Sequence, residues 1–494
     1  MKTEEKRGAI IEDGKVVQWL FEQEEEITRS GNIILGKVKD IIPGMEAAFI
    51  DIGVEKNGFL YRNELIKYQP YRDTVKQDAS EPPKITSIIT KGEKIVVQVM
   101  KEETGTKGVR LTENYSLPGK YIVYLPHGNY VAVSKKMASD IVRDKWRNCG
   151  RSWLKSNEGI IIRTSAEEAE EETILEELNR LRTQHEDMLK STQEDAPLLL
   201  FNQSSIIYRV YRDFFSDGET EVVIDDAKAY QSLLSLSGIE TKSRIELYQR
   251  KEDIFSVYEL DKQLEKSLKK HVWLKNGSFL IIESTEAMTV IDVNTGKFTG
   301  KGSLRDTVFK TNIEAAEAVA QQLRLRDIGG IVLIDFIDMK HEEDKAVVLN
   351  KLKKTAAKDP VMTNVAGFTQ FGLVEMTRKK ARKTLTDLLM TDCPACGGNG
   401  KVRTLKTSLA SLERDVEAVK HTEAEALLIT VTPGVLKALL ADNKNNIRKV
   451  ETRAAKTIYL IPEPELEKRY PYHAIRMLGT KEEMKTSWLQ RLSK

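Results

Sequence analysis

The chain has 494 residues, of which 40% are hydrophobic and 31% charged, and its formal net charge is only +2. This length predicts about three domains, and the near-balance of charge excludes a polycation, so any affinity for nucleic acid must come from local basic patches. Three cysteines exclude a disulfide framework. There is no apolar run of membrane-spanning length and no secretory signal at the start, so we expect a cytoplasmic protein.

The first segment, residues 1–31, is too short to hold a core and is expected to pair with a later part of the chain. Residues 32–116 contain strand-like runs separated by turn residues, which is typical of an all-β barrel. The stretch GKVKDIIPGMEAAFIDIGVEKNGFLYRNEL resembles an OB-fold, a barrel that stacks bases on aromatic side chains and holds phosphates with cations. Phe59 is the stacking candidate, although phenylalanine is usually buried in a core. Lys107, in the loop TGTKG, is the candidate for contact with phosphate or ribose.

An Arg-Thr pair, Arg163–Thr164, precedes a long helix predicted to begin at about Ala166, with Thr164 or Ser165 as its N-cap. Helix N-termini attract anions and arginine binds phosphate, so the pair is a candidate phosphate seat within residues 117–204. A purely structural role at the start of a helix is the alternative.

Two apolar runs that contain aspartate follow: AMTVIDVNTG at residues 287–296 and GGIVLIDFIDM at residues 329–339. Their β-branched residues predict buried strands covered on both faces, where an unpaired carboxylate is costly. A helix is predicted between them, so the returning strand would bring Asp335 beside Asp292, with Asn294 on the same face as Asp292. Two carboxylates and an amide form an oxygen site of the kind that Mg²⁺ prefers. The alternative is a surface carboxylate beside a helix cap.

A cluster of cations follows in RKKARK, and its first members are Arg378, Lys379 and Lys380. A charge run is usually a solvated face. Beside a phosphodiester site it predicts contacts with the nucleic-acid backbone and salt-dependent binding.

Cys393 and Cys396 lie in CPACGGNG, which has the form of a zinc knuckle. A structural zinc site needs four ligands, and the only other cysteine, Cys149, is distant in the sequence. One chain then supplies half a site, and two chains would complete a Cys₄ tetrahedron, which predicts a zinc-linked homodimer. A redox CxxC and a site completed by a histidine such as His421 are the alternatives.

The stretches TEAMTVIDVNTG and TNIEAAEAVAQQLRLRDIGGIVLIDFIDM, with GNIILGKV and CPACGGNG, resemble the ribonuclease E / ribonuclease G family over nearly the whole chain. The resemblance implies a Mg²⁺-dependent endoribonuclease that cuts single-stranded, AU-rich RNA to 5′-phosphate and 3′-hydroxyl ends, in rRNA maturation and mRNA decay. It makes Asp292 and Asp335 the metal ligands, oriented by Asn294. It also makes Arg163–Thr164 the sensor of a 5′-monophosphate, and it implies a dimer linked by a shared zinc ion, with tetramers left open.

The family also implies an architecture that combines multidomain α/β and all-β parts. These are a ribonuclease-H-like subdomain split between 1–31 and 205–275, an inserted OB-fold RNA-binding domain at 32–116, a 5′-sensor region at 117–204, a DNase-I-like nuclease core at 276–392, a zinc link at 393–400 and a small α/β carboxy-terminal domain at 401–494. Nothing resembles the long disordered tail of the ribonuclease E type, so the ribonuclease G branch matches better. Two rival functions are an RNA-binding protein with an inert nuclease core and a metal-dependent phosphohydrolase of small molecules.

Overall fold

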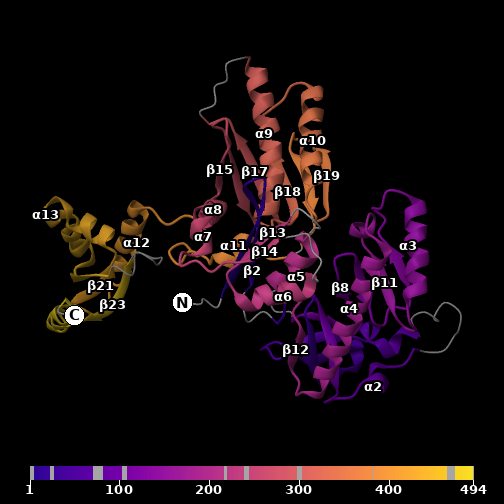
Figure 1. The fold of residues 1–494 in the computed structure, drawn as a ribbon. Coiled ribbons are helices and arrows are strands. Elements are labelled where there is room, and N and C mark those ends of the chain that lie inside the picture. The colour runs from indigo at the N-terminus through magenta and orange to yellow at the C-terminus, as the bar shows by residue number, and fades with distance from the viewer. Residues whose placement is uncertain are drawn as a thin grey trace. The chain divides into compact units, whose positions relative to one another are not determined.

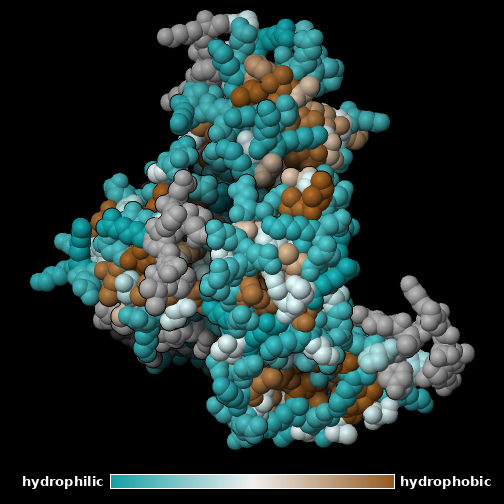
Figure 2. Space-filling view, turned by 45° about the vertical axis from the view of Figure 1, so that its right-hand side comes forward, coloured by the Kyte–Doolittle hydropathy of each residue, from teal (hydrophilic) through white to brown (hydrophobic). Residues whose placement is uncertain are grey.

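A computed structural model of the protein describes residues 5–22, 27–70, 82–102, 108–215, 220–237, 244–296, 303–380, 382–463 and 473–492. The chain divides into two compact units, Met1–Arg382 and Lys383–Lys494, and the fold is mixed α/β and multidomain, as predicted (Figure 1). No helix in these ranges is long and apolar enough to cross a membrane. The face seen in Figure 2 is mainly hydrophilic, with apolar residues in separate patches.

A closed five-stranded barrel is the OB-like part of the first unit. Its strands are β3 (Ile33–Ile42), β4 (Ala47–Asp51), β5 (Gly58–Tyr61), β6 (Lys94–Lys101) and β7 (Arg110–Thr112). They are hydrogen-bonded in the order β3-β4-β5-β7-β6, and β6 pairs with β3 to close the barrel. The predicted all-β barrel is therefore confirmed. Its loops and edge carry α2 (Ile85–Ile88), the 3₁₀ turns Pro43–Met45, Arg62–Glu64 and Ile66–Tyr68, and β12 (Leu198–Phe201), which pairs with β3.

The amino-terminal hairpin packs against a segment about 200 residues later in the chain. The hairpin is β1 (Lys6–Glu12) and β2 (Lys15–Glu22), and the later segment contains α5 (Ile206–Arg209), a π-helical turn (Val210–Phe214), β13 (Glu221–Ile224), α6 (Ala227–Ser237), β14 (Arg244–Leu247), α7 (Ile254–Val257) and α8 (Leu260–Ser267). The Trp19 indole N–H donates to the Ser267 hydroxyl at 3.1 Å, and the Ile206 N–H donates to Glu22 at 2.8 Å. In the described ranges β1–β2 and β13–β14 form two separate sheets, so the ribonuclease-H-like assignment stays a prediction.

The region between the barrel and this segment is a small sheet with two helices. Its strands are β8 (Leu117–Pro118), β9 (Ile122–Leu125), β10 (Val131–Val133) and β11 (Gly159–Ile162), and its helices are α3 (Asp140–Trp153) and α4 (Glu171–Lys190), with 3₁₀ turns at Thr164–Ala166 and Ser191–Gln193. Trp146 of α3 is almost fully buried and packs in the core that this sheet shares with α4.

A six-stranded sheet of order β15-β16-β17-β18-β20-β19 follows. The strands are β15 (His271–Trp273), β16 (Phe279–Ser284), β17 (Met288–Asn294), β18 (Gly330–Asp335), β19 (Thr363–Phe368) and β20 (Val374–Arg378). Helix α9 (Leu304–Leu325) connects β17 to the parallel strand β18, as predicted, and α10 (Glu342–Ala356) packs beside α9 (Figure 1).

These two helices cover only one face of the six-stranded sheet. The core on that face includes Leu280, Ile282, Ile291, Val293, Val332 and Ile334 from the strands and Ala316, Val319, Val348 and Leu352 from the helices. On the other face Val290 is 38% exposed and Ile331 is 47% exposed. The prediction of strands covered on both faces is therefore wrong, because apolar residues on the solvent side concealed the two-residue period of a half-buried strand.

The second unit contains a three-stranded sheet of order β22-β21-β23. Its elements are α11 (Leu385–Leu389), α12 (Leu405–Ala418), β21 (Ala426–Val431), α13 (Pro433–Ala454), β22 (Thr457–Pro462), β23 (His473–Gly479) and α14 (Lys481–Leu492). Every residue of β21 is buried, because both faces of this central strand are covered by side chains of the neighbouring helices.

Candidate active site and RNA contacts

Asp292 and Asp335 are direct partners in the parallel pairing of β17 with β18. Both lie near the carboxyl ends of their strands, where ligands of parallel sheets commonly bind. Because cross-strand partners project from the same face, both carboxylates belong to the face that the helices leave open. The Asn294 amide donates to Oδ2 of Asp292 at 2.7 Å. The predicted convergence of these three residues is present.

The charges at this site suit a cation. Partial burial, then the nearby carboxylates of Asp292 and Asp338, raise the pKa of Asp335. The described residues contain no group of three or more histidine, cysteine, aspartate or glutamate side chains that could hold a metal ion. A Mg²⁺ ion here would thus have two carboxylate ligands and take its remaining ligands from water or substrate oxygens, which is usual for this ion. The residues fit Mg²⁺ on these grounds.

A buried asparagine that the sequence analysis missed fixes the backbone beyond Asp335. Asn312 of α9 is fully buried. Its amide N–H donates to the Ile337 carbonyl at 2.8 Å, and its carbonyl accepts from the Ile337 N–H at 3.1 Å. Both ends of one side chain thus hold the segment that carries Asp338. The signal in the sequence was a polar residue within the apolar stripe of the helix.

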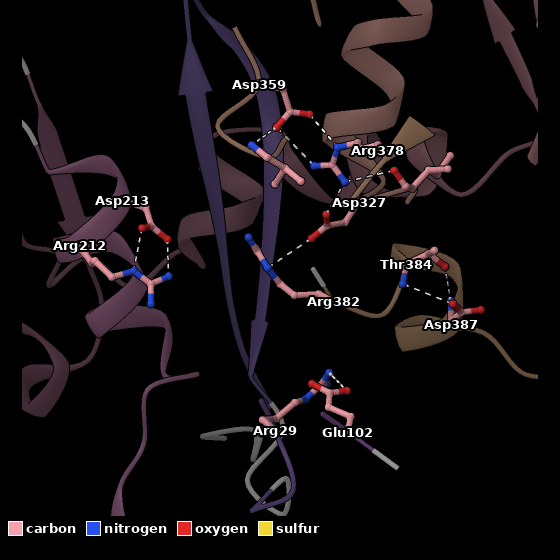
Figure 3. A network of polar contacts seen from close by, with 12 residues as sticks. Arg29, Glu102, Arg212, Asp213, Asp327, Asp359, Arg378, Arg382, Thr384 and Asp387 are labelled. Atoms are coloured by element: carbon pink, nitrogen blue, oxygen red, sulfur yellow. Dashed lines mark hydrogen bonds and ion pairs between the residues drawn. The ribbon is translucent and has the colours of Figure 1, made fainter. Parts of the chain in front are cut away.

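Arg378 does not belong to a cationic surface. Its side chain is only 2% exposed. The guanidinium donates to Asp359 at 2.7 Å, to Asp327 at 2.8 Å and to the Ile328 carbonyl at 3.1 Å (Figure 3). Arg382 also pairs with Asp327, at 3.5 Å. The predicted contact of Arg378 with the RNA backbone is wrong, since its donors are consumed inside the protein.

Lys379 and Lys380 are exposed, but they lie at the far end of the sheet from the aspartates. Arg378, which precedes them, pairs with Gly330 at the start of β18, whereas Asp335 ends that strand. Five residues of extended chain span roughly 17 Å. The prediction of a cationic patch directly beside the metal site therefore needs correction: RNA would reach these lysines only some nucleotides away from the cut.

Arg163 and Thr164 lie at the start of a 3₁₀ turn, Thr164–Ala166, rather than at the start of the long helix. Helix α4 begins at Glu171, and the Ser165 hydroxyl donates to the Lys120 carbonyl at 2.5 Å instead of capping that helix. The Arg163 guanidinium donates to the Gly119 carbonyl at 2.6 Å, and burial lowers its pKa. The Thr164 hydroxyl is hydrogen-bonded to Ser134 at 2.8 Å. Any anion seat here depends on these side chains, not on a helix terminus.

Phe59 lies on the outside of the barrel with two further aromatic residues. Its ring meets Phe49 at 5.5 Å and Tyr61 at 4.7 Å between centroids, both edge-on. The Arg110 guanidinium lies over the Tyr61 ring at 5.1 Å. Phe49 and Arg110 were missed because only the pairing of β4 and β7 with β5 brings them beside Phe59, whereas Tyr61, two residues after Phe59 on β5, could have been found from strand alternation. Lys107 lies outside the described residues.

The two cysteines of CPAC share one tight turn. The Cys393 carbonyl accepts from the Cys396 and Gly397 amides, and the Gly400 amide donates to Cys396 Sγ at 3.2 Å. Amides of Ala395 and Cys396 lower the pKa of the Cys393 thiol. Such N–H groups directed at sulfur favour the thiolate, which is the metal-binding form. The two cysteines therefore fit a thiolate-binding metal such as zinc and would supply two of its four ligands.

Comparison with known proteins decides the family. The profile described as "Ribonuclease E/G family" matches residues 116–381, and the profile "RNase E/G, Thioredoxin-like domain" matches residues 392–475. The chain belongs to the ribonuclease E/G family. It is 35% identical to ribonuclease G of Salmonella typhimurium over 93% of this chain and 95% of the relative, and 35% identical to ribonuclease G of Escherichia coli K12 over the same shares.

Members named ribonuclease E match over a smaller part of their own length. That of Nostoc is 39% identical over 75% of this chain and 54% of the relative, and that of Escherichia coli K12 is 32% identical over 96% of this chain and 45% of the relative. The nearly full-length match to ribonuclease G agrees with the sequence analysis. The protein is an endoribonuclease of RNA processing.

The profile that matches residues 392–475 is described as thioredoxin-like. Because this range includes CPAC, the structure of the motif bears on its redox alternative. Helix α11 ends at Leu389 and α12 begins at Leu405, so the CPAC motif does not lie at the start of a helix. A helix N-terminus is one of the positions that lower the pKa of a redox-active cysteine, so this support for the redox alternative is missing. His421, the other candidate ligand, is exposed and forms no metal-binding group in the described part of the chain.

Proposed function

We propose that the protein is a Mg²⁺-dependent endoribonuclease of the ribonuclease G type. It cuts single-stranded, AU-rich RNA to 5′-phosphate and 3′-hydroxyl ends during rRNA maturation or mRNA decay. The observation that carries the proposal is the direct pairing of Asp292 with Asp335 on an open sheet face. Neither acidic motif contains a histidine, which argues against a cyclic-phosphate mechanism.

The chain's own residues build the reaction site in three ways. Asp292 and Asp335 would hold Mg²⁺, which when bound neutralises charge on the scissile phosphate and lowers the pKa of a water molecule. Asn294 fixes one oxygen of Asp292, so that carboxylate keeps its orientation. Asn312 clamps the peptide at Ile337 and so limits movement of the segment that follows Asp335.

Other parts of the first unit supply surfaces for the rest of the RNA. The barrel presents Phe59 with Phe49 and Tyr61, a group suited to base stacking. Arg163 and Thr164 form a proposed seat for a 5′-monophosphate. The Arg163 side chain is 34% exposed although it pairs with Asp213 at 3.7 Å, and Thr164 next to it in the chain is exposed. In this proposal, occupation of the seat speeds cleavage.

We also propose that zinc joins two chains through Cys393 and Cys396. The turn presents two sulfurs with amide donors around them, and a structural site needs four ligands. A second copy of the same turn completes the set.

The experiment that tests the proposal uses a short AU-rich RNA with either a 5′-monophosphate or a 5′-hydroxyl, in Mg²⁺ or in EDTA. We expect internal cuts only with Mg²⁺, and faster cuts with the monophosphate. Asp335→Asn should abolish cleavage and retain RNA binding. The control is Glu283→Gln, which should cut normally; it changes an exposed carboxylate of β16, two residues after Ile281, the partner of Asp292. Normal cutting by Asp335→Asn would refute the metal site.

Two rival functions predict other results. An RNA-binding protein with an inert core would bind this RNA without cutting it under any of these conditions. A phosphohydrolase of small molecules would hydrolyse a phosphodiester such as bis-p-nitrophenyl phosphate and leave the RNA intact, although it would have little use for the aromatic surface of the barrel.

A further inference from the structure

An exposed tryptophan lies in the same rows of the six-stranded sheet as the active-site side chains. Trp273 pairs with Phe279, and Phe279 pairs with Asn294. In the adjacent row of this face, His271 pairs with Ile281 and Ile281 pairs with Asp292. Because paired residues project from the same face, the aromatic side chains of β15 and β16 share the open face with the aspartates.

The two rings form one fixed surface rather than scattered apolar residues. Trp273 and Phe279 have centroids 5.0 Å apart, and the His271 ring lies 5.7 Å from Phe279 on the other side. Phe279 packs against the backbone of Gly296, where a Cβ atom would lie 3.2 Å from the ring. Trp273 nevertheless remains 65% exposed. A tryptophan with so much free surface, backed by a second ring, has an apolar face available to a ligand.

The hairpin that carries Trp273 is anchored to the helix layer. Leu274 and Ser278 close the turn by a hydrogen bond of 2.8 Å, and the Lys275 amide donates to Glu314 of α9 at 2.6 Å. The backbone next to Trp273 is therefore fixed before any ligand binds, which lowers the entropy cost of stacking. Lys275 in the same turn is exposed.

We infer that Trp273 and Phe279 form a stacking platform for one base of the RNA substrate, next to the phosphate that is cut; the inference rests on the proposed aspartate site. Neighbouring strands are about 4.8 Å apart, so Trp273 lies roughly 10 Å from the Asn294 strand. A nucleotide adjacent to a phosphate at Asp292 and Asp335 reaches that far. Base stacking is tolerant of sequence, because every base has a π face. The platform thus positions the strand without choosing the base.

RNA is favoured over a protein partner because the platform is continuous with the carboxylates. A protein seated on Trp273 and Phe279 would also cover Asp292, which pairs with Ile281, two residues after Phe279 on β16, and would block the reaction site. A single-stranded base fills the aromatic surface while its phosphate reaches the aspartates.

The test uses the full chain with Asp335→Asn, so that RNA is bound without cleavage, and a short AU-rich RNA carrying 2-aminopurine at one position at a time. We expect quenching of 2-aminopurine at the position beside the cut site that the wild-type protein defines. Trp273→Ala should abolish that quenching and weaken binding by about fivefold to a hundredfold, whereas Trp273→Phe should retain most of both. Tyr258→Ala, which removes an aromatic residue that is 46% exposed outside this sheet, should change neither.

Three results would overturn the platform: unchanged quenching in Trp273→Ala, equal losses in Trp273→Phe and Trp273→Ala, or a change of oligomeric mass in Trp273→Ala that marks this face as a protein interface. The binding readout does not need cleavage. If the wild-type protein failed to cut RNA with Mg²⁺ while Trp273→Ala still lost the quenching, the nuclease proposal would fail and the platform would stand, with the quenched position located by scanning the label along the RNA.

Discussion

The Asn294 amide donates a 2.7 Å hydrogen bond to Oδ2 of Asp292, two residues before it on the same face of β17. Groups that orient a metal ligand commonly contribute 10- to 100-fold to metal affinity or activity. Asn294→Ala should therefore lower kcat/KM by about 10- to 100-fold and move half-maximal activity to higher Mg²⁺ concentration. The measurement is the cleavage rate over a series of Mg²⁺ concentrations. Asn364→Ala, an exposed asparagine of β19 in the same sheet, is the control, and equal behaviour of the two variants would contradict the orienting role.

Arg378 should contribute to stability rather than to RNA binding. Its removal leaves the buried Asp359 carboxylate without a guanidinium partner and leaves Asp327 only the 3.5 Å pair with Arg382, and breaking a buried ion pair costs about 3–5 kcal/mol. Arg378→Ala should lower the unfolding midpoint in urea, whereas Lys379→Ala, an exposed neighbour, should change stability by less than about 0.5 kcal/mol. If Arg378→Ala instead weakened RNA binding at unchanged stability, the buried network would not have the role assigned to it.

A pair of partly buried histidines should make the region around α4 acid-sensitive. Burial lowers the pKa of His127 and of His185, and the charge of His127 lowers that of His185 further. The unfolded chain then takes up protons near pH 6.5, before the folded chain does, so stability is full above that pH and falls as pH drops below it. Urea unfolding followed by tryptophan fluorescence at pH 7.5 and 5.5 measures this loss, because Trp146 lies in the core of the same region.

His185→Gln should reduce the acid sensitivity, and His341→Gln, at the exposed N-cap of α10, should leave it unchanged. The Tyr115 hydroxyl is hydrogen-bonded to His185 at 3.0 Å, and glutamine preserves a polar partner for it. An unchanged difference between the two pH values in His185→Gln would show that other groups cause the loss.

The zinc link predicts a change of mass. Cys393→Ala removes one sulfur from each half-site, so the bound zinc should be lost and the dimer should become a monomer in light scattering. Cys149→Ala, the only other cysteine, should keep both zinc and mass. A Cys393→Ala protein that lost zinc but remained dimeric would refute the shared site.

The local chemistry of this protein could be predicted from its sequence. Period-two runs and turn residues predicted the barrel, and the strand–helix–strand order predicted that Asp292 and Asp335 would be neighbours, because a parallel crossover returns the chain to the same edge of the sheet. The CPAC turn was also local, since its hydrogen bonds join residues within four positions of one another.

In three cases the sequence did not determine which side chains are buried or grouped by contacts between distant segments. Arg378 reads as part of a basic run, and only the packing of Asp327 and Asp359 around it shows that its charge is buried. Val290 and Ile331 read as core, and only the placement of both helices on one face shows that they are exposed. Trp273 reads as an isolated residue, and only the strand register aligns it with Asn294. Sequence patterns determine local conformation because they act through neighbours in the chain, whereas burial and the grouping of a site are decided by contacts between segments far apart in it.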